Sequence, residues 1–104
     1  MTVLGCWQIF VYGRVQAVGY RDWVVSQAAS LGLDGFVRNV SDGTVEIVAS
    51  GALPAVQALE ARCWTGPALA RVFWLDRTEL YDQPPVIPGS GFRRLASVQR
   101  AQIR

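Results

Sequence analysis

The spacing of hydrophobic positions changes several times along the chain, and each change marks a predicted element. Residues 6–12 are rich in β-branched and aromatic side chains and end at Gly13, which predicts a buried strand. From Tyr20 to Leu31 the apolar residues recur at helical spacing, and Gly32 then supplies a stop. The start of the chain is therefore predicted to be a strand, a turn of small residues and a helix.

The next stretch has the pattern of a hairpin followed by a second helix. Two strands are predicted, at about residues 35–40 and 44–50, and the short turn at 41–43 contains a glycine. Pro54 suits the first turn of a helix, and apolar residues follow it on one helical face as far as the stop at Gly66.

The last third predicts more strand. Residues 69–80 alternate in polarity as a long fourth strand does, residues 82–91 contain three prolines and two glycines and form a loop, and residues 91–98 supply a last strand. The order is β-α-β-β-α-β, with a marginal extra strand if the fourth is broken. This predicts an α+β, ferredoxin-like fold, in which two helices cover one face of an antiparallel sheet. A fold alone implies no function.

Composition narrows the class of protein. A chain of 104 residues, 51% of them apolar and 17% charged, fits a single domain spanning 1–104 and not a disordered chain. The net charge of +2 gives little support for nucleic-acid binding, and the apolar start is too short to cross a bilayer. The chain has no histidine, which excludes histidine-based catalysis and histidine-ligated metals. Cys6 and Cys63 are expected to be buried, reduced thiols, and the alternative is a disulfide between them.

The turn GRVQAVG, residues 13–19, is the first candidate site. A turn of small residues that leads into a helix can point several backbone N–H groups inward and form an anion cradle. Arg21, in the first helical turn, could close over a bound anion with its fork of donors. The alternative is an ordinary strand-to-helix connection with a solvated arginine. The loop lacks the spacing and the lysine of a Walker motif.

Asn39 is the second candidate, because asparagine is disfavoured within strands. Its amide could orient a water molecule by donating and accepting at once. The alternative is that it starts the turn through hydrogen bonds to its own backbone. Neighbours on a strand alternate in direction, so Arg38 is expected on the opposite face of the sheet in a structural or solvated role.

Other side chains are predicted to be structural or peripheral. Arg14 is at most a peripheral contributor to the positive field near an anion. Glu46 is expected at the surface, whereas three aromatic residues are expected in the core, namely Trp23, Phe36 and Trp74.

Together, GRVQAVGYR and GFVRNVSDGTVEIVASG resemble the two signatures of the acylphosphatase family. The first signature is matched at Gly13, Val15, Gln16, Val18, Tyr20 and Arg21. The second is matched at Gly35, Phe36, Val37, Arg38, Asn39, Gly43, Val45 and Gly51. Gly66-Pro67 and Gly91-Phe92 are also similar to the family pattern, so that the resemblance covers nearly the whole chain. The ferredoxin-like fold predicted above is the family's fold.

The resemblance implies an enzyme that hydrolyses the carboxyl-phosphate bond of small acyl phosphates without a metal or organic cofactor. Arg21 would neutralise the phosphoryl group, and Asn39 would orient the attacking water. Backbone N–H groups would come from a loop that consists of Val15, Gln16, Ala17, Val18, Gly19, Tyr20 and Arg21. We expect a monomeric, cytoplasmic enzyme whose partner is its small-molecule substrate, with neither nucleic acid nor membrane involved.

Ala17 departs from the family pattern, which has glycine there. A positive φ at this position would strain alanine by about 1–2 kcal/mol, whereas a negative φ would suit it. Arg21 and Asn39 are both retained, which favours an active enzyme. Two alternatives remain: a phosphate-binding domain that no longer turns over, and a single-stranded RNA module, for which Phe36 alone among the central aromatic positions gives support. The tail from Ser97 to Arg104 extends past the family's last strand, and its role is open.

Overall fold

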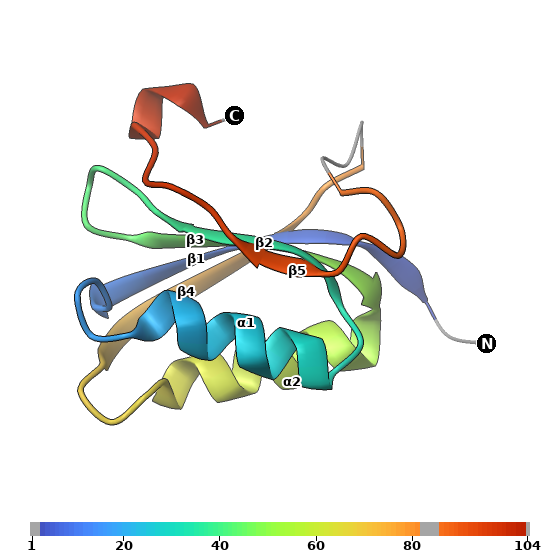
Figure 1. The fold of residues 1–104 in the computed structure, drawn as a ribbon, viewed down its shortest axis with the longest axis horizontal. Helices are drawn as coiled ribbons and strands as arrows, with labels where there is room; N and C mark the ends of the chain where they lie inside the picture. The colour runs from blue at the N-terminus through green and yellow to red at the C-terminus, as the bar shows by residue number, and fades with distance from the viewer. Residues whose placement is uncertain (1–2, 82–85, 104) are drawn as a thin grey trace.

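The computed structural model describes residues 3–81 and 86–103, and it places two helices on one face of a five-stranded sheet (Figure 1). The elements follow the predicted order. They are β1 Leu4–Arg14, α1 Tyr20–Ser30, β2 Asp34–Asn39, β3 Val45–Ala52, α2 Leu53–Thr65, β4 Arg71–Glu79, β5 Phe92–Arg94 and a 3₁₀ turn, η1, Arg100–Gln102. Residues 82–85 of the predicted loop lie outside the described residues.

The sheet confirms the ferredoxin-like prediction. Its strand order is β4-β1-β3-β2-β5, and β1 pairs antiparallel with β3 on one side and with β4 on the other. β2 pairs antiparallel with β3, which completes the four-stranded arrangement of the fold.

The fifth strand differs from the prediction of a strand over 91–98 in an antiparallel sheet. β5 pairs with β2 in parallel and contains only Phe92–Arg94. The chain then leaves the ladder and returns to it at a single parallel bridge between Val98 and Val40. The direction is parallel because β5 runs opposite to β4, and β4 itself runs antiparallel to β2 (Figure 1).

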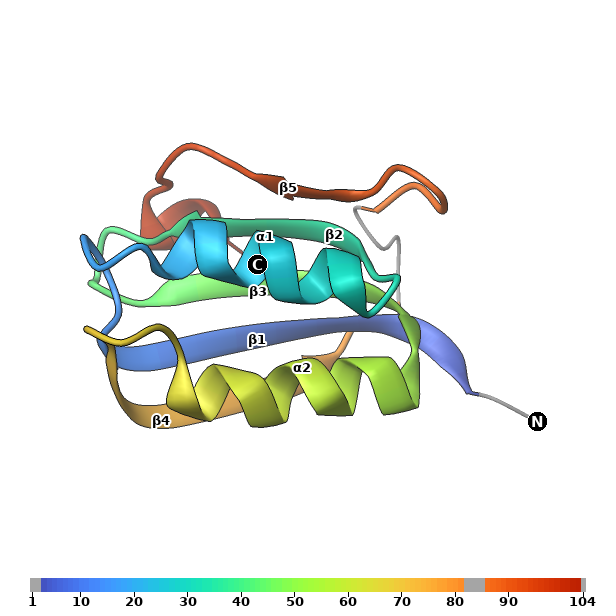
Figure 2. The ribbon, with the colours of Figure 1, turned by 60° about the horizontal axis from the view of Figure 1, so that its bottom comes forward.

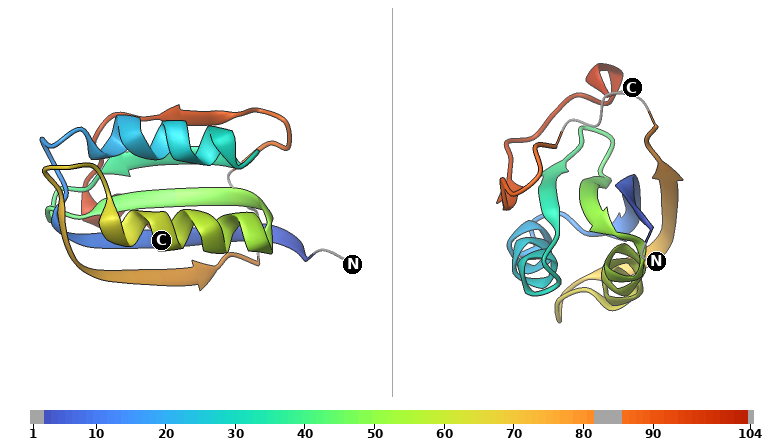
Figure 3. Two further views of the ribbon diagram at one scale, coloured as in Figure 1. Left: turned by 90° about the horizontal axis from the view of Figure 1, so that it is seen from below. Right: turned by 90° about the vertical axis from the view of Figure 1, so that its right-hand side faces the viewer.

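The core lies between the sheet and the two helices, which lie side by side on the same face (Figures 2 and 3). Alternate residues of the strands point toward the helices, as the period of two predicts, and fully buried examples are Ile9, Val11, Val37 and Ile47. The Tyr20 hydroxyl donates a 2.6 Å hydrogen bond to the backbone carbonyl of Cys63, so it joins the start of α1 to the end of α2.

The opposite face of the sheet holds a buried ion pair. Glu46 is only 2% exposed, so the expectation of a surface residue was wrong. Arg38 lies directly across the β2–β3 ladder and donates to the Glu46 carboxylate at 2.6 Å, and Gln8 of β1 donates to the other oxygen at 2.8 Å. The pairing explains how a carboxylate is accommodated beneath the surface. It also confirms a structural role for Arg38.

The aromatic predictions had mixed outcomes. Trp23 is half-buried and packs against the core, as expected. Trp74 is 57% exposed, so its placement in the core was wrong. Its strand, β4, is the edge of the sheet, and there the side chain turns to Asp76 and packs edge-on against Trp64. Phe36 is half-buried on the outer face beneath the Arg38 guanidinium.

Gly13 sets the point at which β1 gives way to the turn. The β1–β4 register shifts between Tyr12 and Gly13, and a Cβ at Gly13 would lie 2.1 Å from the Arg71 carbonyl oxygen. Only glycine allows this approach, so the signature glycine keeps the start of the loop against β4.

Both cysteines are buried and unpaired, as predicted. Within the described ranges, no helix is both long and apolar enough to cross a membrane.

Candidate active site

The predicted site residues lie at one end of the sheet. The loop after β1, the first turn of α1 and the β2–β3 hairpin all lie at the left in Figure 1. Arg21 starts α1 and Asn39 ends β2, so the topology brings both elements to the same end.

The loop from Val15 to Gly19, predicted to form an anion cradle, connects β1 to α1. Val15 is 1% exposed and anchors the loop in the core, whereas Ala17 and Gly19 have positive φ values of 60° and 78°. Among the described residues, no acceptor binds a backbone N–H from Val15 to Gly19, and the N-terminal end of α1 follows at once. Unpaired N–H groups beside a helix N-terminus are the feature that binds anions.

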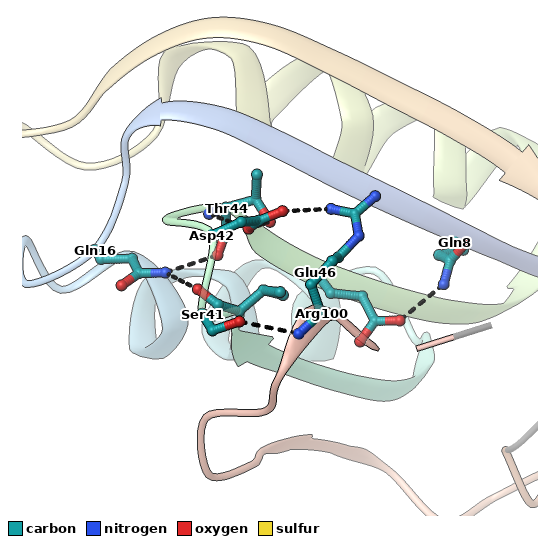
Figure 4. Close-up of polar contacts among 8 residues, drawn as sticks. Gln8, Gln16, Ser41, Asp42, Thr44, Glu46 and Arg100 are labelled. Atoms are coloured by element: carbon teal, nitrogen blue, oxygen red, sulfur yellow. Dashed lines mark hydrogen bonds and ion pairs between the residues drawn. The ribbon is translucent and has the colours of Figure 1, made fainter. Parts of the chain in front are cut away.

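Gln16 fastens this loop to the hairpin. Its side-chain amide donates 2.8 Å hydrogen bonds to the carbonyl oxygens of Val40 and Thr44, one on each side of the β2–β3 turn (Figure 4). Gln16 was predicted to contribute its backbone alone, and this role of its side chain was missed. The Gln16 amide therefore fixes the loop after β1 and also connects it to the end of β2, where Asn39 lies.

Arg21 is half-buried and held beside β5. Its Nη1 donates a 3.3 Å hydrogen bond to the Leu95 carbonyl, and the Leu95 N–H donates to Val37, two residues before Asn39. Burial, followed by the nearby positive charge of Arg94, lowers the pKa of Arg21. Arginine nevertheless stays charged at neutral pH. The guanidinium thus supplies a fixed positive charge. Because partial burial of a charge is unfavourable, a bound anion would stabilise it.

Asn39 has a buried side-chain oxygen, Oδ1, with no hydrogen-bond partner among the described residues. It does not form the turn: that role belongs to Asp42, whose Oδ1 accepts from the Thr44 N–H at 3.0 Å and from the Thr44 hydroxyl at 2.6 Å. Asn39 instead lines a hollow of ≈ 280 Å³ together with Gln16 and residues of the C-terminal segment. Buried polar atoms without a partner are rare in native proteins and call for an explanation.

The described residues offer no group of three or more cysteine, aspartate or glutamate side chains that could hold a metal ion. The N–H donors, the amides and the Arg21 guanidinium at this end of the sheet suit an anion, and the carboxylates of Asp22 and Asp42 are paired with Arg94 and Arg100.

Two helices on one face of a ferredoxin-like sheet define the structural class as an α+β sandwich. The family model described as Acylphosphatase matches residues 7–94. An acylphosphatase of Azorhizobium caulinodans is 48% identical over 90 residues, which cover 86% of this chain and 94% of that protein.

Solved structures agree. An acylphosphatase from Coxiella burnetii superposes with a TM-score of 0.79 at 35% identity, covering 88% of this chain and 93% of that one. For an acylphosphatase from Bacillus subtilis the TM-score is 0.80 at 32% identity, with 89% and 99% covered. The chain therefore belongs to the acylphosphatase family, and its enzyme class is acylphosphatase.

Proposed function

We propose that this acylphosphatase hydrolyses small acyl phosphates to a carboxylate and inorganic phosphate by in-line attack of water. The N–H groups of Val15 to Arg21 hold the phosphoryl oxygens, Arg21 neutralises their charge, and Asn39 orients the water. The P–O bond to the carboxylate breaks as the P–O bond to water forms, and the carboxylate leaves with the electron pair.

The chemistry requires little acid or base from the protein. A carboxylate is a good leaving group, and the phosphoryl oxygens can take up the proton of the attacking water. What remains is to position the reactants and to stabilise charge, and these two effects account for most of the catalysis in phosphoryl transfer. A chain without histidine can supply both.

The observation that best supports this function is the unpartnered Oδ1 of Asn39. Leaving a buried polar group without a partner costs about 1–3 kcal/mol, so the site has a use for that oxygen as an acceptor. A water molecule that donates to Oδ1 has its lone pair free to attack a phosphorus held on the loop.

The test is phosphate release from an acyl phosphate in the presence of a chelator. We expect Asn39→Ala to lower kcat by about 10² to 10³, as loss of a well-placed polar group commonly does. Gln57→Ala is the matched control, because it removes an exposed amide on α2, and it should keep the parental rate. Full activity in Asn39→Ala would refute the assigned role.

The second candidate is a domain that binds phosphate without turnover, and the positive φ of Ala17 is the observation that favours it. A misdirected N–H in the cradle could retain the anion while slowing the reaction. Titration with inorganic phosphate separates the two functions. A parent that binds phosphate but releases none from acyl phosphates, with activity restored by Ala17→Gly, would establish the binding domain.

A further inference from the structure

The segment Leu95–Ile103, here called the C-terminal segment, contacts both proposed catalytic residues. Its Leu95 carbonyl accepts the 3.3 Å hydrogen bond from Arg21, and its Val98 N–H donates at 3.0 Å to the backbone carbonyl of Asn39. The Ser41 N–H donates back to Val98 at 2.9 Å, so the segment is paired on both sides of Val40. The family match ends at Arg94, so the C-terminal segment lies outside it although its partners Arg21, Asn39 and Ser41 lie inside.

Arg100 fastens the segment to the rest of the molecule. Its Nη1 lies 2.8 Å from the Oδ2 of Asp42, and its backbone N–H donates to the Ser41 hydroxyl at 3.0 Å (Figure 4). Its guanidinium lies 4.0 Å from the ring centroid of Phe10. These contacts reach the hairpin and β1. The segment starts beside β2 at the edge of the sheet, and the end-on view in Figure 3 shows η1 on the side of the sheet away from the helices. The ion pair and the cation–π contact together favour the docked segment by about tenfold.

The docked segment also forms one wall of the hollow beside Asn39. The segment contributes three residues to the lining of the hollow, namely Ser97, Gln99 and Gln102. The loop after β1 contributes Gln16, and β2 contributes Asn39. The wall keeps its shape because Gln99 and Gln102 cap each other across η1. A hollow of ≈ 280 Å³ is far larger than the volume of about 30 Å³ per molecule in liquid water. The hollow therefore has room for several water molecules, and the segment limits the directions from which they approach Asn39.

We propose that the C-terminal segment is part of the active site and that Arg100 is a positioning residue for Asn39. The inference rests on the proposed function, because it requires Asn39 to orient the attacking water. Arg100 holds the segment, Val98 holds the backbone of Asn39, and the polar wall limits the positions open to the water. Arg21 and the cradle need less help from Arg100, because β5 and Gln16 already fix them.

The experiment compares Arg100→Ala, Arg100→Lys and the parent in steady-state hydrolysis of an acyl phosphate. We expect Arg100→Ala to lower kcat about tenfold, whereas KM and the inhibition constant of inorganic phosphate stay within about twofold. Arg100→Lys keeps a cation for Asp42 and Phe10 and should retain most of the rate. Arg62→Ala is the matched control: it removes an exposed arginine that bonds Gln27 and Ser30 of α1, and its kcat should equal the parental value.

A double-mutant cycle excludes an effect that is merely structural. In an Asn39→Ala background, Arg100→Ala should cost no further activity, because the residue it positions is gone. Asp42→Asn is a second way to release the segment: it removes the charge opposite Arg100 but keeps the Oδ1 that accepts from Thr44. It should lower kcat as Arg100→Ala does.

The outcomes separate the two proposals. If Asn39→Ala is inactive and both Arg100→Ala and Asp42→Asn keep the parental kcat, the inference on the C-terminal segment is overturned and the proposed function stands. If Arg100→Ala lowers kcat equally in the parent and in Asn39→Ala, Arg100 does not act through Asn39 and the inference again fails. If Asn39→Ala is fully active, the proposed function fails, and the inference with it.

Discussion

Ala17 is the residue at which this chain departs from the family pattern, and its φ of 60° shows what the departure costs. Alanine in the left-handed region is strained by about 1–2 kcal/mol. Glycine removes that strain, but its greater backbone entropy in the unfolded chain destabilises the folded state by about 0.4–1 kcal/mol. The strain outweighs the lost freedom, so Ala17→Gly should raise the free energy of unfolding by about 0.5–1 kcal/mol, as measured by urea denaturation.

Ala29→Gly is the matched control, because Ala29 is exposed within α1. The same substitution there should destabilise the protein by about 1 kcal/mol. Because Ala17 already adopts the required backbone conformation, we expect Ala17→Gly to change kcat/KM by less than about threefold, which is under 1 kcal/mol in the barrier. A stability loss in both variants would show that Ala17 is not strained.

Glu46 and Arg38 make a second case in which one residue depends on another. Arg38→Met would leave the Glu46 carboxylate buried with Gln8 as its remaining partner. Removing one member of a buried pair typically costs about 3–5 kcal/mol. Arg38 is partly exposed, so we expect about 3 kcal/mol in urea unfolding, and Arg38→Met combined with Glu46→Gln should recover most of it because no unpaired charge remains. A double variant no more stable than Arg38→Met would contradict this account.

At the scale of elements, Gln16 connects the loop after β1 to the β2–β3 hairpin, so the relative position of the cradle and Asn39 depends on it. Gln16→Met keeps the size of the side chain but loses both donated hydrogen bonds. Gln16→Glu is worse, because its carboxylate would face two carbonyl oxygens. We expect kcat/KM to fall about tenfold in Gln16→Met and further in Gln16→Glu, each hydrogen bond being worth about 0.5–1.5 kcal/mol.

Gln57→Met and Gln57→Glu on the exposed side of α2 supply the matched controls and should keep parental kinetics. Steady-state assays of all four variants test whether kcat/KM depends on the Gln16 amide. Urea unfolding verifies that each variant is folded. Equal rates in Gln16→Met and Gln16→Glu would mean that the amide does not act as the donor.

The elements themselves were largely predictable because their signals are local. The period of two in β1, the helical period after Tyr20 and the glycine turn of the hairpin each lie within a dozen residues. The predicted surface position of Glu46 was wrong because only the register of β2 and β3 shows that Arg38 lies opposite it. Trp74 was misplaced because alternation gives the face of a strand but not its place at the edge of the sheet. The contribution of the C-terminal segment to the site was also not predictable from local patterns. It depends on the parallel pairing of β5 with β2, which places the segment beside Asn39.

At the scale of the whole molecule, the packing of α1 against α2 makes the free energy of unfolding depend on pH in the alkaline range. Burial raises the pKa of the Cys63 thiol from 9.0 to about 12, and burial also raises the pKa of Tyr20 above its ordinary 10.0. In the unfolded chain these groups ionise at their ordinary values, so a rise in pH lowers the free energy of the unfolded state before that of the folded state. The Cys63 contribution to stability is complete below pH 9 and is lost as pH rises from 9 toward 12, whereas the Tyr20 contribution is complete below pH 10 and declines above it.

We therefore expect the urea midpoint to be constant between about pH 7 and 8.5 and to fall steadily above about pH 9. Cys63→Ala should make this decline shallower, because the Cys63 contribution is lost while the contributions of Cys6, from about pH 9, and of Tyr20, from about pH 10, remain. Cys6→Ala gives the comparison with the other buried thiol, whose pKa burial also raises, from 9.0. A midpoint that stays constant to about pH 11 in the parent would mean that the α1–α2 contact opens locally and lets the thiol and the phenol ionise without unfolding the sheet.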